Sequence, residues 1–330
     1  MNLPWLVADV GGTNARFGLV TEPGRGPGSV AVLAVADHAG LPEAVAAYLA
    51  GHAGGVRPEA ACVAIAGPVE GDRYRLTNAG WAGSVRDLGI AHVELVNDFE
   101  ALAASLPHLP AAELVGLGGP APGHGVKVVL GPGTGLGVAG LVPAAEGWVP
   151  VPGEGGHVTV PVLDERDHEI VRALRAEGTG QVVAEHLLSG PGLTRLHHAL
   201  ALVRGVRAPR LAASDIVARM DDSLCAETVE VFCGMLGTFA GNVALTLGAR
   251  GGVYLGGGVL PRIVERVRAS DFRRRFEAAP TMNGYLSGIA TSLIVAPQPA
   301  LLGAAAWLGQ RLAAAPKSPN PSKPSKLEYA

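Results

Sequence analysis

The sequence predicts an α/β protein that consists of two lobes. At 330 residues the chain is longer than one typical domain, so two structural units are expected. In its first third, short apolar runs alternate with a helical pattern, which is typical of a mainly parallel sheet covered by helices. A stretch rich in glycine and proline at residues 116–125 then separates this part from a second series of strands and helices.

The expected elements of the first part follow from its apolar runs. We expect strands at residues 3–8, 17–20, 30–35, 62–66 and 93–96. A helical pattern at 41–49 lies between the third and the fourth of these strands. A short turn at Gly11 and Gly12 joins the first two runs, which predicts an antiparallel hairpin at the start of the chain.

The second part repeats this alternation. We expect strands at 126–130, 136–142 and 253–255, and helices near 165–175, 193–203, 226–248 and 301–312. These elements predict a smaller domain at 1–109 and a larger domain at 110–299, with a helix at about 300–313 that returns to the first domain. Residues 314–330 are rich in proline, serine and lysine, so we expect a disordered tail.

Composition and charge exclude several classes of protein. A formal net charge of -3 argues against a protein that binds nucleic acid or anionic membranes, which would carry a basic excess. Cys62, Cys225 and Cys233 have neither metal-binding nor redox spacing, so we expect a reducing, cytoplasmic location. We find no signal-peptide pattern and no apolar run of about 18 residues, and we therefore expect no membrane span.

Two glycine turns that carry a threonine predict a phosphate site. The first is Gly11-Gly12-Thr13 and the second is Gly133-Thr134-Gly135, and each lies between two apolar runs. Both turns would place several backbone N–H groups on one concave side, where they attract phosphate oxygens without needing a lysine. A plain hairpin turn remains the alternative for each loop taken singly, but the recurrence of Gly-Thr favours phosphate binding.

Asp9 and a third glycine cluster extend this interpretation. A carboxylate that ends a buried strand is costly unless it is paired, hydrogen-bonded or close to a metal ion. Next to a phosphate site its natural partner is Mg²⁺, which keeps several of its own waters, so we expect Asp9 to face the ion through water. The run at 253–255 leads into Gly256-Gly257-Gly258, where backbone without side chains would admit a ring or a ribose, or would simply form a turn.

Asp98 is the strongest candidate for chemistry in the first part. It follows Asn97 at the end of an expected strand, and an apolar-periodic helix comes directly after it. Ligands of α/β sheets bind at the carboxyl ends of the strands. The alternative is an aspartate that only caps the helix.

Further polar residues occur in glycine-rich surroundings of the second part. Glu154 and His157 flank two glycines, which suggests a turn that directs both side chains into one cleft. Glu185 begins a short apolar stretch, and Asn78 follows a strand-like segment upstream. Carboxylates, an amide and an imidazole can read hydroxyl groups by paired hydrogen bonds. The three arginines at 273–275 predict a solvated helix face instead, with an anion-binding rim as the alternative.

Seven motifs in order resemble those of a known family. "ADVGGTNAR", "GPGTGLG" and "GGGVLPR" are similar to the phosphate-1, phosphate-2 and adenosine motifs of the sugar-kinase, heat-shock-protein-70 and actin superfamily. With "VNDFEAL", "VPGEGGHV", "AEHLLSGPGL" and "GNVALTLGARGGVYLGGG", the sequence resembles the bacterial glucokinases of the proteobacterial type. The resemblance covers about residues 6–312 and implies a two-lobed, ribonuclease-H-like fold of the actin-like ATPase and hexokinase type with a central cleft.

The resemblance also implies an activity and a set of site residues. It implies that ATP phosphorylates D-glucose at the 6-hydroxyl group, with Mg²⁺, in a homodimer, and that Asp98 is the catalytic base. The implied glucose contacts are Asn97, Asp98, Glu154, His157 and Glu185, and Asn78 is added on the same hydrogen-bonding logic. The implied ATP contacts are Ala8, Asp9, Gly11, Gly12, Thr13, Asn14, Gly133, Thr134, Gly135, Gly257 and Gly258, with Asp9 also as the Mg²⁺ contact.

Two alternatives to a glucokinase remain. The first is a kinase for another hexose, such as mannose, fructose or an N-acetylhexosamine, because sequence does not fix hydroxyl stereochemistry. The second is a sugar sensor or repressor without catalytic activity. A repressor would need a DNA-binding segment ahead of the first phosphate motif, which starts at Ala8, and an inert sensor would be expected to lose Asp98.

Overall fold

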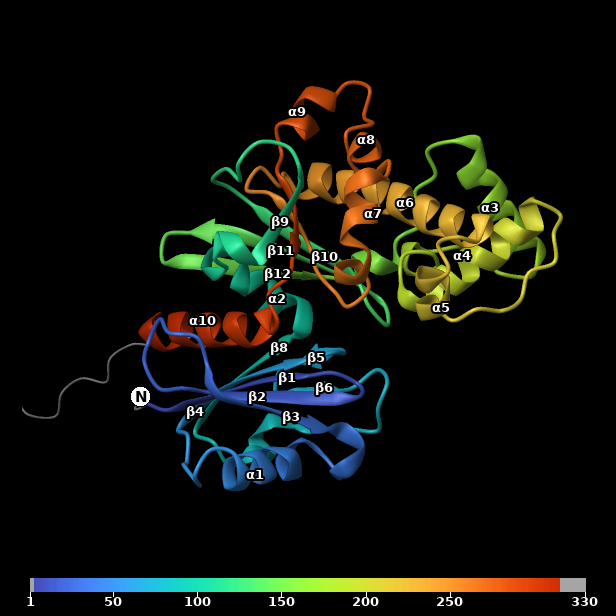
Figure 1. Ribbon diagram of the computed structural model, residues 1–330. Coiled ribbons are helices and arrows are strands. Elements are labelled where there is room, and N and C mark those ends of the chain that lie inside the picture. Colours follow the sequence, from blue (N-terminus) through green and yellow to red (C-terminus); the bar gives the residue numbers. More distant parts are fainter. Residues whose placement is uncertain (1–2, 315–330) are drawn as a thin grey trace, which may run out of the picture.

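The computed structural model describes residues 3–314 and shows two lobes (Figure 1). The lower lobe in that view contains strands β1 to β8, and the upper lobe contains the later strands and most of the helices. The expected tail at 314–330 lies outside the described residues, except that Ala314 ends the last helix. The division into domains at 1–109 and 110–299 stays a prediction.

The first sheet has the order β3-β2-β1-β4-β8. Its strands are β1 (Trp5–Val10), β2 (Asn14–Val20), β3 (Gly28–Ala34), β4 (Ala60–Ile65) and β8 (His92–Asn97). The β1–β2 pair is antiparallel, which confirms the hairpin predicted from the glycine turn. β1, β4 and β8 run parallel, so their carboxyl ends lie at one edge of the sheet.

Alternation along the central strands builds a core on each face of this sheet. Leu6 and Ala8 pack with Tyr48 of α1 (Leu41–Gly51), whereas Val7, one residue further along, packs with Leu301 of α10 (Pro299–Ala314). Successive strand residues point to opposite faces, which explains why the apolar runs of β1 and β4 are continuous. The C-terminal helix thus covers one face of the N-terminal sheet.

The second sheet has the order β12-β11-β10-β13-β14-β9. Its strands are β9 (Leu114–Gly118), β10 (Lys127–Pro132), β11 (Leu136–Ala144), β12 (Gly147–Gly153), β13 (Val253–Leu255) and β14 (Thr291–Ile294). β10, β13 and β14 are parallel, and β10 and β11 form the second predicted hairpin. The predicted start of the loop at 116–125 is wrong, because residues up to Gly118 belong to an edge strand that pairs with β14.

A small three-stranded sheet of β5 (Val69–Glu70), β6 (Arg73–Arg75) and β7 (Ala82–Ser84) is present that was not expected from the sequence. These strands are two or three residues long, too short to give a periodic pattern. The sheet lies at the side of the N-terminal lobe, close to the gap between the lobes in Figure 1.

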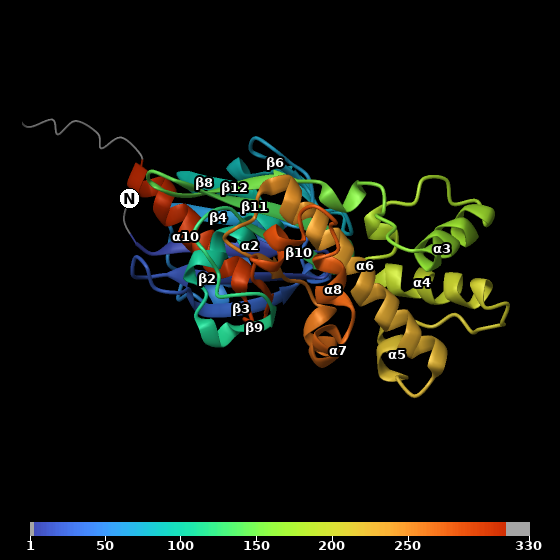
Figure 2. The same ribbon diagram turned by 90° about the horizontal axis from the view of Figure 1, so that it is seen from above.

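Helices cover the second sheet and extend beyond it. They are α3 (Glu165–Ala176), α4 (Gly190–Val203), α5 (Ala213–Ala218), α6 (Ser223–Leu247), α7 (Val264–Ala269), α8 (Phe272–Phe276) and α9 (Asn283–Ser287). Figure 2 shows α3, α4 and α5 grouped at one end of the molecule. By length and composition alone, α6 is long and apolar enough to span a membrane, although no such run was expected from the sequence. Because 78% of its apolar window is buried inside the protein, it is a core helix.

The arginines of α8 correct a further expectation. Arg275 is buried and forms an ion pair with Asp167, and it also donates to Thr238 of α6. Arg273 donates to the backbone carbonyl of Ile289, so only Arg274 lies on a solvated face. The predicted solvated face is wrong because α8 packs closely on α6, where a Cβ atom at Gly241 would lie 2.5 Å from the Phe276 carbonyl oxygen.

Two helices connect the lobes. α2 (Asp98–Ser105) follows β8 of the first sheet and packs against β10, β11 and β12 of the second. α10 packs on α2, and the side-chain amide of Gln310 both accepts from Trp148 N (3.0 Å) and donates to Trp148 O (2.9 Å) in β12. The N-terminus of α2 therefore lies where the two sheets meet.

Candidate active site

Two acidic side chains occupy the same edge of the first sheet. The register places Val10 of β1, Ile65 of β4 and Asn97 of β8 at one level. Asp9 precedes this level by one residue and Asp98 follows it by one residue. Because one strand separates them, their backbones are about 10 Å apart, two strand spacings. The structure thus brings together the two carboxylates that the sequence analysis singled out.

The start of α2 fixes the position of Asp98. Asn97 is the N-cap: its side-chain oxygen accepts from Phe99 N (2.8 Å), and Glu100 accepts from Asn97 N (2.8 Å). The Asn97 amide also donates to the carbonyl of Gly67 at 3.3 Å. Asp98 is the first helical residue and accepts from Phe99 N at 3.0 Å. The capping role that was an alternative for Asp98 therefore belongs mainly to Asn97.

Burial and a like charge tune the two carboxylates. Burial raises the pKa of Asp98 to about 7, and the negative charge of Asp9 adds to the rise, while backbone hydrogen bonds oppose it. Burial also raises the pKa of Asp9, against the attraction of Arg16, whose Nη1 lies 3.3 Å from Asp9 Oδ2. A carboxylate with a pKa near 7 is well matched to accept a proton at neutral pH.

The first glycine turn lies beside Asp9. Gly11 N donates to Asn14 O at 3.0 Å, and Thr13 O accepts from Val35 N at 2.9 Å, which closes the hairpin. A Cβ atom at Gly12 would lie 2.8 Å from Asn78 Cβ, so Asn78 packs directly on this turn. Ala8 differs from the other predicted ATP contacts, because its side chain is fully buried in the core and does not reach the turn.

The second glycine turn contacts Glu185. Gly133 O accepts from Gly190 N at 2.8 Å, and Leu136 N donates to Glu185 Oε2 at 2.8 Å. A Cβ atom at Gly135 would overlap this carboxylate. Thr134 is exposed at the tip of the turn. The turn therefore holds one of the predicted sugar contacts in place.

The residue after Asp98 and the third glycine cluster both pack against the segment around the second turn. The ring of Phe99 occupies the space that a Cβ atom at Gly137 would need, so the residue after Asp98 lies on β11. Gly257 adopts a φ of 86°, and a Cβ atom there would overlap the carbonyl oxygen of Pro132. Gly258 faces open space. Asp98 therefore interacts with the charge of Asp9 in the first lobe, and its neighbour Phe99 packs on the strand that follows the second turn.

Glu154 and His157 are more open to solvent than the sequence analysis suggested. Glu154 caps a 3₁₀ turn (Gly155–His157) that ends at His157, and His157 Nε2 lies 3.7 Å from Glu154 Oε2. The side chains of Glu154 and His157 are 83% and 60% exposed, respectively. A Cβ atom at Gly156 would overlap the carbonyl of Leu136, so the turn lies across the start of β11. Both side chains therefore lie next to the residue that binds Glu185, without being enclosed with it.

The donor set around Asp9 fits a hydrated Mg²⁺. Residues 3–314 contain no cluster of three or more His, Cys, Asp or Glu side chains that would hold a metal ion by itself. Asp9 is instead a single, mostly buried carboxylate beside a turn of backbone N–H groups. Such a site suits an ion that is held mainly by water and by phosphate oxygens.

Sequence reasoning missed two supporting residues. Arg16 is the cross-strand partner of Asp9, and Glu100 completes the capping box of α2. Arg16 lies within the first motif, and the hairpin register could have paired it with Asp9. Glu100 three residues after Asn97 is the spacing of a capping box, which was a readable signal.

Known proteins resemble this chain over most of its length. The sequence model of the family described as Glucokinase matches residues 6–311. The glucokinase of Aromatoleum aromaticum is 48% identical over 318 residues, which cover 94% of this chain and 96% of the relative. The glucokinase of Saccharophagus degradans is 45% identical and covers 93% and 98%, respectively.

Solved structures show the same fold. The crystal structure of a glucokinase from an Antarctic psychrotroph superposes with a TM-score of 0.84 at 36% identity, over 92% of this chain and 98% of that one. A glucokinase from Balamuthia mandrillaris, at 20% identity and a TM-score of 0.74, shares the fold. These likenesses confirm the two-lobed α/β fold of the actin-like ATPase type expected from the sequence. The chain belongs to the glucokinase family.

Proposed function

We propose that this protein transfers the terminal phosphoryl group of ATP to the 6-hydroxyl group of D-glucose. The observation that carries the proposal is Asp98, a partly buried carboxylate whose pKa of about 7 is raised partly by the charge of Asp9, and whose neighbour Phe99 packs on Gly137, two residues after the second Gly-Thr turn. Relatives that are 44–48% identical over more than nine-tenths of the chain are glucokinases, which supports the same reaction here.

Asp98 is proposed as the general base. A sugar hydroxyl is a weak nucleophile, and a positioned carboxylate accepts its proton as the oxygen attacks. The new bond joins the 6-oxygen to the terminal phosphorus, the bond from that phosphorus to the bridging oxygen breaks, and ADP leaves. Helix α2 holds the carboxylate through its backbone N–H and its capping box, so the base is oriented before the substrate arrives.

The two turns are proposed to bind the phosphates from opposite lobes. In the first turn, Gly12 and Thr13 offer backbone N–H groups beside Asp9, whereas Gly11 N already donates to Asn14 O at the foot of the turn. In the second turn, Thr134 and Gly135 do the same beside Glu185, whereas Gly133 N donates to Gly135 O. Backbone dipoles in a water-poor cleft stabilise the charge that develops during phosphoryl transfer. Asp9 would hold Mg²⁺ through water, and the ion would supply further neutralisation of phosphate charge.

The sugar is proposed to bind at the junction of the lobes. Glu185 is already ordered by Leu136 N, whereas Glu154 and His157 are exposed. We therefore propose that glucose draws these two side chains together as the lobes close and exclude water, which would otherwise accept the phosphoryl group. Asn78 and Asn97 complete the proposed contacts, although the Asn97 amide is engaged with backbone carbonyls.

The nucleotide and the assembly complete the proposal. Gly257 and Gly258 adjoin the second turn and would admit the adenosine, and Ala8 contributes only backbone. The homodimer and the cytoplasmic location rest on the family resemblance, and three buried, unpaired cysteines are compatible with a reducing compartment.

A coupled assay with a panel of hexoses tests this function. We expect ATP-dependent ADP release with glucose at a kcat/KM at least tenfold above those for mannose, fructose and N-acetylglucosamine. The Asp98→Ala variant should still bind glucose but lose turnover by several orders of magnitude. A higher kcat/KM with another hexose would show that glucose is not the preferred substrate. Normal turnover in the Asp98→Ala variant would refute the role of Asp98 as the base.

A further inference from the structure

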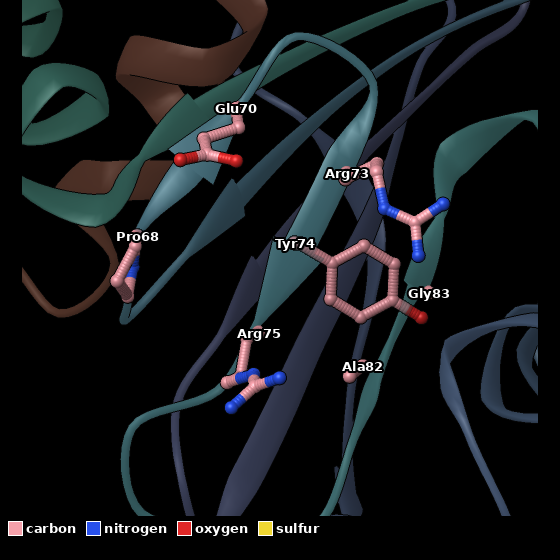
Figure 3. A pocket seen from close by; sticks show the side chains of 7 residues that line it. All are labelled: Pro68, Glu70, Arg73, Tyr74, Arg75, Ala82 and Gly83. Carbon is pink, nitrogen blue, oxygen red and sulfur yellow. The ribbon is translucent and has the colours of Figure 1, made fainter.

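The three-stranded sheet β5–β6–β7 carries a concave polar surface outside the proposed catalytic cleft. A cavity of about 380 Å³ is lined by residues that include Glu70, Arg73, Arg75, Ala82 and Gly83. Figure 3 shows the side chains of Glu70, Arg73 and Arg75 around this pocket. None of these residues belongs to the proposed glucose, ATP or Mg²⁺ contacts.

Two exposed guanidinium groups line this pocket without a contact ion pair, although the charge of Arg73 acts on Asp72. Arg73 and Arg75 are two residues apart on β6, so their side chains share one face of the strand. Neither forms an ion pair within 4 Å with a carboxylate in the described part of the chain. By contrast, the nearby Arg86 pairs with Asp72 at 2.5 Å. The two arginines thus retain their hydrogen-bonding capacity for a ligand.

Short residues on the neighbouring strand leave these arginines uncovered. The register pairs Arg73 with Ser84 and Arg75 with Ala82 of β7. On the other side, β5 places Glu70 opposite Arg73. The pocket therefore presents two cations and one carboxylate, and the ring of Tyr74 lies between the two arginines in Figure 3.

We propose that this pocket binds a phosphate monoester that carries hydroxyl groups, the chemistry of a sugar phosphate. Guanidinium groups present planar forks of N–H donors that match phosphate oxygens, and two of them in one pocket can bind one phosphate dianion. Glu70 accepts hydrogen bonds only, so it suits the hydroxyl groups of the same ligand rather than its phosphate. The net positive charge of the pocket complements a dianion.

The side chains of this pocket have no proposed role in catalysis, although Pro68 follows Gly67, whose carbonyl accepts from the Asn97 amide; binding to the pocket is measurable without turnover. Strand β6 ends at Arg75, three residues before Asn78, which packs on the first glycine turn. Neither arginine has an assigned role in phosphoryl transfer. A failure of the binding proposal and a failure of the proposed kinase reaction are therefore distinguishable.

Calorimetric titration with sorbitol 6-phosphate tests the proposal. We expect saturable binding that weakens as salt is raised, because the contact is between charges. The double variant Arg73→Gln/Arg75→Gln should lose at least tenfold in affinity. The matched control Arg57→Gln, which removes an exposed charge from the same lobe, should retain it. Inorganic phosphate should bind several-fold more weakly than the polyol phosphate, because it lacks the hydroxyl chain.

Two further results decide the proposal. Circular dichroism and thermal unfolding should show that the double variant remains folded, since both side chains are exposed. The variant Arg73→Lys/Arg75→Lys keeps the charge but loses the fork, and we expect several-fold weaker binding. Unchanged affinity in the Gln double variant would place the ligand elsewhere and overturn the proposal, as would equal loss in the Arg57→Gln control.

Discussion

Replacing Asp98 by asparagine should abolish most activity and yet stabilise the fold. Burial and the charge of Asp9 raise the pKa of Asp98 from 3.8 to about 7, so the folded state disfavours the ionised form. At about 1.4 kcal/mol per pKa unit, this rise corresponds to about 4 kcal/mol at most. Because the side chain is partly exposed, solvent screening lowers this figure, and we expect about 2 kcal/mol.

The sign of the effect depends on pH. The folded-state pKa lies above the unfolded value, so the penalty is fully present above pH 7 and disappears below pH 4. Asparagine carries no charge and can still accept the hydrogen bond from Phe99 N. The gain in stability of the Asp98→Asn variant should therefore be largest at pH 8 and vanish near pH 4.

Urea unfolding and steady-state kinetics together test this reasoning. At pH 8 we expect the free energy of unfolding to rise by about 2 kcal/mol and kcat to fall by about 10²–10⁴. Asp221→Asn, which neutralises an exposed aspartate, is the matched control and should change neither quantity. A variant that is less stable than the wild type at pH 8, or a difference that does not depend on pH, would refute the reasoning.

Three further outcomes follow from the site and the core. In initial-rate measurements, kcat/KM for glucose should fall about tenfold per pH unit below pH 7, because the base becomes protonated; a flat profile to pH 5 would contradict this. Gly257→Ala should raise the KM for ATP but not for glucose, because a methyl group would overlap Pro132 O at a positive φ; an equal rise in both would contradict a nucleotide role. Arg275→Met should lower the urea midpoint, with a cost of about 3–5 kcal/mol, because Asp167 stays buried without its ion-pair partner and keeps only the hydrogen bond from Leu163 N; an unchanged midpoint would contradict that account.

Local patterns were enough to predict the framework of the fold. The strands of both sheets that are at least six residues long were expected in the right place, except β12, because they carry continuous apolar runs or end in glycine turns. β12 (Gly147–Gly153) was missed because Pro150 and Pro152 interrupt its apolar pattern and a glycine stands at each end. The strand β9 was missed for a similar reason, since Gly116 and Gly118 suggested a loop, whereas pairing with β14 decides the structure.

Contacts between distant parts of the chain could not be predicted. Arg275 looked solvated, because nothing local shows that Asp167 and Thr238 enclose it. At the site, the proximity of Asp9 and Asp98 could be predicted, because each lies at the carboxyl end of a strand and parallel strands end at the same edge of a sheet. The Asn97 amide is different: its partners are the carbonyls of Ile65, at the end of β4, and of Gly67, just after it, which only the folded structure brings near.

The most direct test of the central claim is the identity of the phosphorylated atom and its dependence on Asp98. The measurement is phosphorus–proton correlation NMR of the product formed from ATP and D-glucose by the wild type and by Asp98→Asn. We expect coupling of phosphorus to the two C6 protons, with formation by the variant slower by about 10²–10⁴. Phosphate on another oxygen, or equal rates for the two proteins, would contradict the account.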